Sequence, residues 1–192
     1  MNTKQTKSYN KWVNEGYKYF AEVGPNNFSI KELGRISGLS RTSFNYYFDS
    51  KEFFFDLLID FHTKEIEKFG KFAISNKSDL TNGIIKAMER FNIGMKFHTQ
   101  LFNNREIRKY NDAYLEGHNM SYCTGILDWF INFFNLNISK EDGKKVFLLF
   151  IDVLNTRFNI SYQSRNESTL FSTIFTEVVN DFTLLLGSKR ND

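Results

Sequence analysis

Residues 29–58 read SIKELGRISGLSRTSFNYYFDSKEFFFDLL, and this stretch decides the fold of the N-terminal part of the chain. It opens with Ser-x-x-Glu, a capping box that predicts a short helix over about residues 29–37. Gly38 follows, and glycine readily adopts the positive φ of a tight turn. Ser40 is a favoured N-cap for a second short helix that runs to about Tyr47. The pattern therefore predicts two short helices joined by a glycine turn.

Two short helices joined in this way are the helix-turn-helix of many DNA-binding proteins. Their steep crossing needs a small residue where they touch, and Gly34 supplies it. Buried apolar anchors are needed on both sides of the turn, and the candidates are Leu33, Leu39, Phe44 and Tyr47 or Phe48. The second helix must also present polar or basic side chains to base edges near its N-terminus. Arg41, Thr42 and Ser43 meet this requirement.

The segments on either side predict two more helices. Residues 7–23 carry apolar and aromatic side chains at helical spacing, and this helix ends at Gly24-Pro25 because proline disfavours helical geometry in the residue before it. Asp49-Ser50-Lys51-Glu52 is a second capping box and predicts a long helix at about residues 50–69. We therefore expect a three-helix DNA-binding domain at residues 1–50, with the fourth helix linking it to the rest.

The remainder, residues 51–192, keeps a 3.6-residue spacing of apolar positions in long stretches. Gly70 to Asp79 is small and polar and indicates a connector, and Ser139 with Asp142 marks a helix start. Further helices are expected at about 80–101, 104–117, 120–135, 140–162 and 168–186. No long strand-like alternation is present. The predicted fold is all-α, with about nine helices and a larger C-terminal helical domain for effector binding and dimerisation.

The composition agrees with packed helices, since the chain has 22 Phe and 9 Tyr but one Pro. An AT-rich coding genome explains part of this bias equally well. The net charge of +3 is too small to indicate nucleic-acid binding by itself. Its distribution is more informative, because seven basic and three acidic side chains precede Asp49. The positive excess lies where a phosphate backbone would be met.

Several classes of protein are disfavoured by the residues that are absent. Cys123 is alone, so neither a disulfide framework nor a cysteine metal cluster is expected. His98 and His118 have no His-x-x-x-His or Glu-x-x-His spacing, and His62 is distant in sequence, so no metal site is predicted. No nucleophile elbow, phosphate-binding glycine loop or dinucleotide fingerprint is present. We therefore expect no catalysis and no cofactor.

No membrane association is expected either. The first twenty residues lack an apolar signal core, and the longest purely apolar run, Val146 to Ile151, is far shorter than the ~20 residues that span a bilayer. The sequence predicts a soluble cytoplasmic protein.

Residues 29–58 resemble the N-terminal signature of the TetR/AcrR family of bacterial transcriptional regulators. The matching features are the Ser/Thr cap, the Ile-x-x-Leu pair, the Gly-Leu-Ser turn, the aromatic residue followed by Phe at the end of the second short helix, and the Ser-Lys-Glu that opens the fourth helix. The resemblance implies base contacts from Arg41, Thr42 and Ser43, with Lys31 near the groove. It also implies phosphate contacts from Tyr47 and Lys51.

This sequence departs from the family pattern at a few positions. Asn45 stands where the family often has Tyr, and it could bond a phosphate or read adenine. Gly34 and Ser37 stand where the family often has Ala. The complete set of predicted DNA contacts is Lys31, Arg41, Thr42, Ser43, Asn45, Tyr46, Tyr47 and Lys51.

The last two helices carry apolar stripes that predict a dimer interface. A dimer is expected because two recognition helices must lie ~34–36 Å apart to meet successive major grooves. The stripes consist of Phe147, Phe150, Ile151, Leu154 and Phe158, and of Leu170, Ile174, Val178, Phe182 and Leu185. Paired across a two-fold axis they would form a four-helix bundle. The alternative is that both stripes belong to the core of one chain.

The middle helices would enclose an effector pocket in a member of the family. The candidate pocket residues are Met88, Phe91, Met95, His98, Phe102, Tyr114, His118, Tyr122, Trp129 and Phe133. Methionine and aromatic walls suit a small apolar or aromatic ligand. The alternative is that each of these side chains only fills the hydrophobic core and contacts no ligand.

The favoured function is a dimeric repressor that binds a palindromic operator in double-stranded DNA and is released by a small hydrophobic ligand. One alternative is a DNA-bound regulator whose C-terminal body responds to a protein partner. Another is an enzyme or small-molecule carrier with a vestigial helix-turn-helix.

Overall fold

The computed structural model describes residues 3–75, 80–123, 125–162 and 170–186 of the chain. Within these ranges the protein forms ten helices and no strand. They are α1 (Thr3–Val23), α2 (Ile30–Ser37), α3 (Arg41–Tyr47), α4 (Lys51–Ser75), α5 (Leu80–Arg90), α6 (Asn92–Asn103), α7 (Arg108–Cys123), α8 (Ile126–Phe133), α9 (Lys140–Tyr162) and α10 (Leu170–Leu185). The all-α prediction is confirmed.

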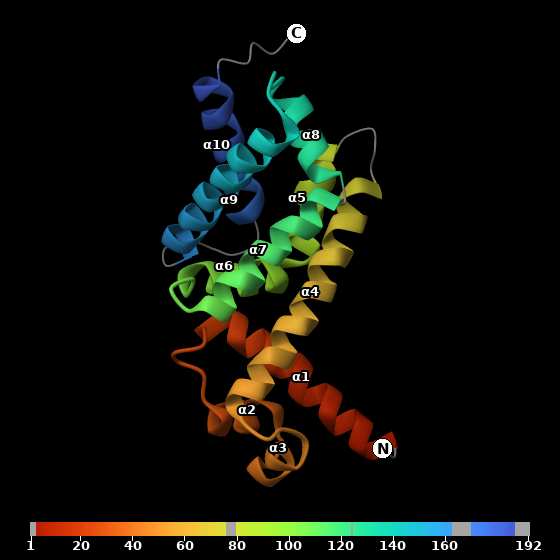
Figure 1. The fold of residues 1–192 in the computed structure, drawn as a ribbon. Coiled ribbons are helices and arrows are strands. Elements are labelled where there is room, and N and C mark those ends of the chain that lie inside the picture. The colour runs from red at the N-terminus through yellow and green to blue at the C-terminus, as the bar shows by residue number, and fades with distance from the viewer. Residues whose placement is uncertain (1–2, 76–79, 124, 163–169, 187–192) are drawn as a thin grey trace.

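The molecule is elongated, with α2 and α3 at one end and α8, α9 and α10 toward the other (Figure 1). The long helix α4 runs between these ends and packs against α1, α5, α6 and α7. A displacement of α4 would therefore change the packing at both ends of the molecule.

The sequence misjudged several helix boundaries in the middle of the chain. The helices expected at 104–117 and 120–135 are instead α7, which continues to Cys123, and α8, which begins only at Ile126. The helix predicted to end near Phe69 continues to Ser75, and the predicted connector is wrong for residues 70–75. Gly70 and Ala73 are buried there, so packing maintains the helix despite the glycine. The rest of that connector, residues 76–79, lies outside the described residues.

The single helix expected at 80–101 is instead divided into α5 and α6. Phe91 separates them with a non-helical backbone of φ −104° and ψ 31°. Its N–H donates to the carbonyl of Ala87 at 2.9 Å, and its carbonyl accepts from Met95 at 3.0 Å. The break therefore loses few backbone hydrogen bonds, and apolar periodicity alone did not reveal it.

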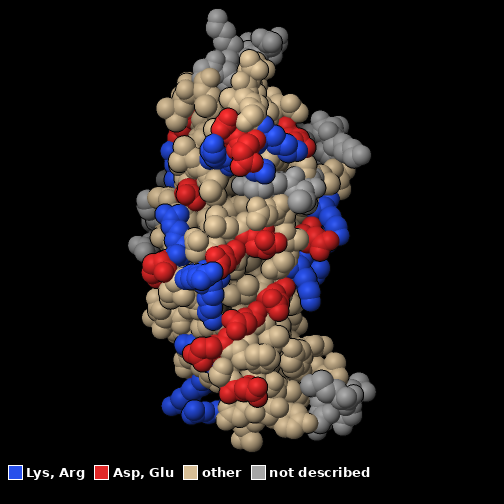
Figure 2. Space-filling model, viewed as in Figure 1, with Lys and Arg blue, Asp and Glu red and all other residues tan. Residues whose placement is uncertain are grey.

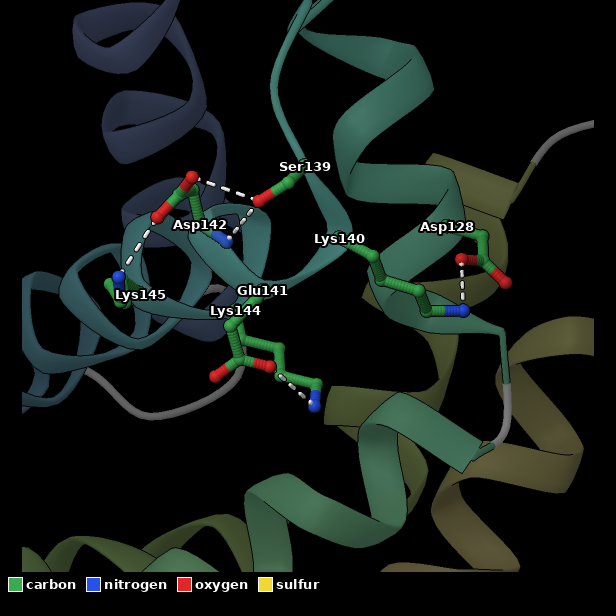
Figure 3. A network of polar contacts seen from close by, with 7 residues as sticks. All are labelled: Asp128, Ser139, Lys140, Glu141, Asp142, Lys144 and Lys145. Carbon is green, nitrogen blue, oxygen red and sulfur yellow. Dashed lines mark hydrogen bonds and ion pairs between the residues drawn. The ribbon is translucent and has the colours of Figure 1, made fainter.

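The predicted start of α9 is confirmed in detail (Figure 3). The Ser139 hydroxyl accepts from the backbone N–H of Asp142 at 3.1 Å and donates to its carboxylate at 2.8 Å. Lys140 then pairs with Asp128 of α8 at 2.7 Å. These contacts fix the turn between α8 and α9.

The two apolar stripes predicted for the dimer interface mostly face each other inside one chain. Phe147, Phe150, Leu154, Phe158, Ile174, Val178 and Phe182 are all at most 5% exposed. Phe150, for example, packs edge to face on Phe182 with ring centroids 5.0 Å apart. These seven side chains cannot meet a partner without unpacking the core, so the interface prediction is wrong for them. Ile151 is partly buried, Leu185 is 79% exposed, and the side chain of Leu170 lies outside the described residues.

The aromatic core of the N-terminal helices also includes side chains from α6 and α7. Phe20 of α1 stacks on Phe97 of α6 with centroids 4.4 Å apart, and both are fully buried. The sequence division at residue 50 therefore crosses a shared core. Among the described helices, none is long and apolar enough to span a membrane.

Candidate functional site

The turn between α2 and α3 is closed by Gly38, whose φ of 65° and ψ of 30° lie in the left-handed region. The N–H of Gly38 donates to the carbonyl of Arg35 at 3.4 Å, and the N–H of Leu39 donates to that of Gly34 at 3.0 Å. This pair of bonds is a Schellman motif, which favours glycine at its left-handed position. The predicted glycine turn is confirmed.

Gly34 lies where α2 approaches the turn. A Cβ at this position would lie 2.9 Å from the carbonyl oxygen of Leu39 and 3.5 Å from the ring of Trp12. The first distance is shorter than a normal contact, and the oxygen belongs to the backbone. Glycine therefore stands at this position because the close approach leaves no room for a side chain.

Serine residues cap the N-termini of α2, α3 and α4, the three helices that come directly after α1. Ser29 accepts from Glu32 N–H at 3.3 Å, and Ser40 accepts from Ser43 N–H at 3.2 Å, as predicted. The cap of α4 is Ser50, which accepts from Phe53 N–H at 3.0 Å. The second capping box was therefore placed one residue too early.

The outer face of α3 is polar and open. Arg41, Thr42, Asn45 and Tyr46 are exposed, and Tyr46 is 65% exposed, whereas Phe44 is buried against Trp12 with ring centroids 5.2 Å apart. The helix is thus held by one apolar side and presents the other to solvent. Four of the predicted contact residues lie on that presented side.

Ser43 has a different environment from its neighbours. Its hydroxyl accepts from the indole N–H of Trp12 at 3.1 Å and donates to the carbonyl of Ser40 at 2.8 Å. These bonds satisfy the buried indole and hold α3 against α1. A base contact from Ser43 therefore remains a prediction that competes with an internal role.

The two predicted phosphate contacts, Tyr47 and Lys51, are both partly buried. Tyr47 packs edge to face on Tyr9 with centroids 5.9 Å apart. Lys51 donates to the carbonyl of Pro25 at 3.3 Å and lies over the ring of Phe55 at 5.1 Å. Lys31 on α2 is exposed. Lys51 thus also connects the start of α4 to the loop between α1 and α2.

Charged side chains of both signs share the surface of the molecule. In the view of Figure 2, basic and acidic side chains are interleaved over the molecule and form no broad area of one sign. On α2, Glu32 and Arg35 pair with each other at 2.6 Å. On this face, charge therefore does not set α2 and α3 apart from the rest of the molecule.

The comparison with protein-family models matches residues 14–58 to the family described as bacterial regulatory proteins, tetR family. This segment contains the turn, the caps and the exposed face of α3. Residues 14–58 form a DNA-binding domain of the tetR type. Comparisons with curated proteins and with solved structures gave no match. The protein is accordingly a DNA-binding transcriptional regulator, and its TetR-type domain was recognised correctly from residues 29–58.

The C-terminal part of this regulator encloses an apolar cavity of about 70 Å³, lined from α4 through α10. Five of the predicted pocket residues line it, namely Met88, Met95, His98, His118 and Trp129. Phe91, Phe102, Tyr114 and Phe133 pack outside its lining, and the side chain of Tyr122 lies outside the described residues. Ile66, Phe147, Phe150, Leu154 and Phe158 line it although they were not among the predicted pocket residues.

The sequence placed His62 apart from the other two histidines, but all three are buried together. His62 Nε2 is hydrogen-bonded to His98 Nδ1 at 3.2 Å, and the rings of His98 and His118 meet edge to face with centroids 5.2 Å apart. His62 Nδ1 is hydrogen-bonded in turn to the hydroxyl of Tyr17 at 2.8 Å. A polar chain therefore leads from the cavity wall to α1. It was missed because its members are far apart in sequence.

Burial keeps these histidines neutral. It lowers the pKa of His62 to about 3 and that of His118 to about 4, and it holds the pKa of His98 well below its usual value, with the neighbouring histidines adding to the effect. Gly117 lets His98 approach α7, since a Cβ at Gly117 would lie 2.8 Å from its ring. In the described residues no three His, Cys, Asp or Glu are grouped so that they could hold a metal ion.

A second polar cluster lies beside the histidines. Tyr114 donates to Asp152 at 2.6 Å, and Asn155 donates to the Tyr114 hydroxyl at 3.3 Å. Thr99 completes it by donating to Asn155 at 3.3 Å. The burial of Tyr114 and its bond to the Asp152 carboxylate raise its pKa, so its hydroxyl stays protonated. This cluster joins α6, α7 and α9 on one side of the cavity.

Proposed function

We propose that this protein is a homodimeric repressor that binds a palindromic operator through α3 and is released by a small apolar ligand in the cavity. The proposal rests on a chain of contacts between the cavity and the TetR-type domain. The His98 ring that lines the cavity is linked through His62 to Tyr17 on α1, one helix of the TetR-type domain.

The connection supplies a physical route for release. Tyr17 is 5% exposed and stacks on Phe97 with centroids 4.6 Å apart, so its position depends on α6. A ligand that shifts His98 would change the packing of α1 against α4 and α6. A ligand that binds one arrangement more tightly shifts the population toward it. Release follows if that arrangement spaces the two α3 helices wrongly for successive grooves.

A dimer interface on α9 and α10 is proposed on their exposed leucines. Leu149 is 58% exposed, Leu184 is 81% exposed, and Leu185 is 79% exposed. These lie on the same two helices as the predicted stripes but outside the core. Arg157 of α9 pairs with Asp181 of α10, which keeps the two helices together as one surface.

The proposal is tested by selecting bound duplexes from a random DNA pool, with and without mixtures of small metabolites. We expect enrichment of a two-fold symmetric site, and loss of that enrichment with at least one mixture. Enrichment of a single half-site would contradict the dimer. Enrichment that no small-molecule mixture changes would favour the regulator with a protein partner instead.

A further inference from the structure

The cavity, taken as the effector site of the function proposed above, has walls that restrict the chemistry of its ligand. Among the described residues no Lys, Arg, Asp or Glu lines it, and the polar side chains of its lining are those of His98, His118 and Asn155. An ionised ligand would lose its hydration there without gaining a charged partner, which is strongly unfavourable. The ligand must therefore be neutral.

Asn155 is fully engaged, and His98 is engaged through one of its two ring nitrogens. Asn155 uses its amide N–H groups on Tyr114 and on the carbonyl of Ile151, and its amide oxygen accepts from Thr99. His98 is bonded to His62 through Nδ1. His118 differs, because its Nε2 is buried and has no hydrogen-bond partner in the described part of the chain. The residue is 4% exposed and lines the cavity.

A buried polar nitrogen without a partner destabilises the folded protein, so it is rarely left in this state without a reason. An ordered water molecule would need two to four polar partners, and among the described residues the cavity offers this one unsatisfied nitrogen. A ligand that is mostly apolar and carries one hydrogen-bonding group matches the walls and the nitrogen together.

The size and type of that ligand follow from the same surroundings. An engineered apolar cavity of about 150 Å³ binds benzene, and the present cavity measures about 70 Å³. Met88 and Met95 line it, and methionine side chains adapt readily to irregular occupants. A single ring is larger than this space, so it fits only if such flexible side chains move aside, and nothing larger is expected. A hydroxyl group can both donate and accept, so it fits either tautomer of neutral His118.

We propose that the cavity binds a small neutral alcohol or phenol of at most about one aromatic ring, whose hydroxyl group hydrogen-bonds to Nε2 of His118. The apolar walls bind the hydrocarbon part, and His118 distinguishes the hydroxyl compound from its hydrocarbon analogue. A site that bonds a hydroxyl group disfavours an analogue that lacks it, because the nitrogen is then left unpaired.

The test is calorimetric titration of the full chain with phenol, toluene and benzoate. We expect phenol to bind about tenfold more tightly than toluene, which corresponds to one hydrogen bond, and benzoate to bind more weakly than either. His118→Leu should bring phenol and toluene to equal affinity, whereas His118→Gln, which keeps a hydrogen-bonding group, should retain a preference for phenol. Thermal unfolding of each variant checks that it folds. If a variant does not fold, the comparison of phenol, toluene and benzoate on the unchanged protein is the test of the ligand assignment.

Equal binding of phenol and toluene, tighter binding of benzoate, or no binding of any of the three would overturn this inference. The same samples are then titrated with the selected operator duplex. DNA binding without phenol binding leaves the regulator intact and removes the ligand assignment. Phenol binding that does not release the DNA keeps the ligand assignment and contradicts the ligand-released repressor.

Discussion

The three buried histidines predict a steep loss of stability in mild acid. Each has a pKa below its ordinary value of about 6.5 in the folded protein, with His62 at about 3 and His118 at about 4. Unfolding exposes them, and below pH 6.5 the unfolded chain binds protons that the folded chain does not. Their contribution to stability is therefore complete above pH 6.5 and is lost as the pH falls toward 4.

The magnitude follows from the number of protons. One proton per pH unit changes the free energy of unfolding by about 1.4 kcal/mol, so three histidines together remove about 3–4 kcal/mol between pH 6 and pH 5. That is a large part of the ~5–15 kcal/mol that stabilises a typical domain. Carboxylates contribute little in this interval, because their ordinary pKa values lie near 4.

Urea unfolding followed by circular dichroism at pH 7, 6, 5.5 and 5 measures this loss. His62→Phe is the matched variant, because it keeps a ring beside Phe97 and should reduce the slope by about one third relative to the unchanged chain. His62 contacts Tyr17, His98 and Phe97, and Glu65 is the acidic group whose charge acts on Tyr17. A free energy of unfolding that stays constant between pH 7 and pH 5 would refute the assignment of neutral buried histidines.

Three further predictions concern the DNA-binding domain, the link to the cavity and the dimer. Gly34→Ala should lower the free energy of unfolding by about 1–3 kcal/mol because its Cβ meets the Leu39 carbonyl. Urea unfolding against Gly125→Ala separates crowding from backbone strain, because Gly125 has a positive φ of 89° and open space around its Cβ, whereas Gly34 has a helical backbone and a crowded Cβ. Tyr17→Phe removes the bond to His62 and should leave ligand affinity unchanged while weakening ligand-driven release from DNA in an anisotropy assay; unaltered release would exclude the histidine chain as the route. Leu184→Glu should dissociate the dimer in sedimentation experiments, and a dimer that persists would place the interface elsewhere.

Local patterns were enough to predict the TetR-type domain from the sequence. The caps at Ser29 and Ser40 and the turn at Gly38 are decided by interactions within a few residues, and all three were placed correctly. Gly34 was identified as the close contact for the same reason, since the turn geometry requires it.

The C-terminal part was harder because apolar periodicity does not say which surface an apolar stripe meets. The stripe containing Phe150 was assigned to a partner, although Phe182 of the same chain covers it. His62 was overlooked in the same way, because its neighbours Tyr17 and His98 come from other helices. Such relations depend on tertiary packing and have no local signal.

The claim most central to this account is that the exposed face of α3 distinguishes bases. It is tested by measuring the affinity of the Arg41→Ala variant for the selected operator and for every single-base change in one half-site, with Lys51→Ala, at a predicted phosphate contact, as the control. Arg41→Ala should lose discrimination at one position, by about 1–3 kcal/mol, while Lys51→Ala should weaken all duplexes alike and reduce the salt slope by about one. If Arg41→Ala kept the base preference of the unchanged protein at every position, α3 would not read DNA through the face proposed here.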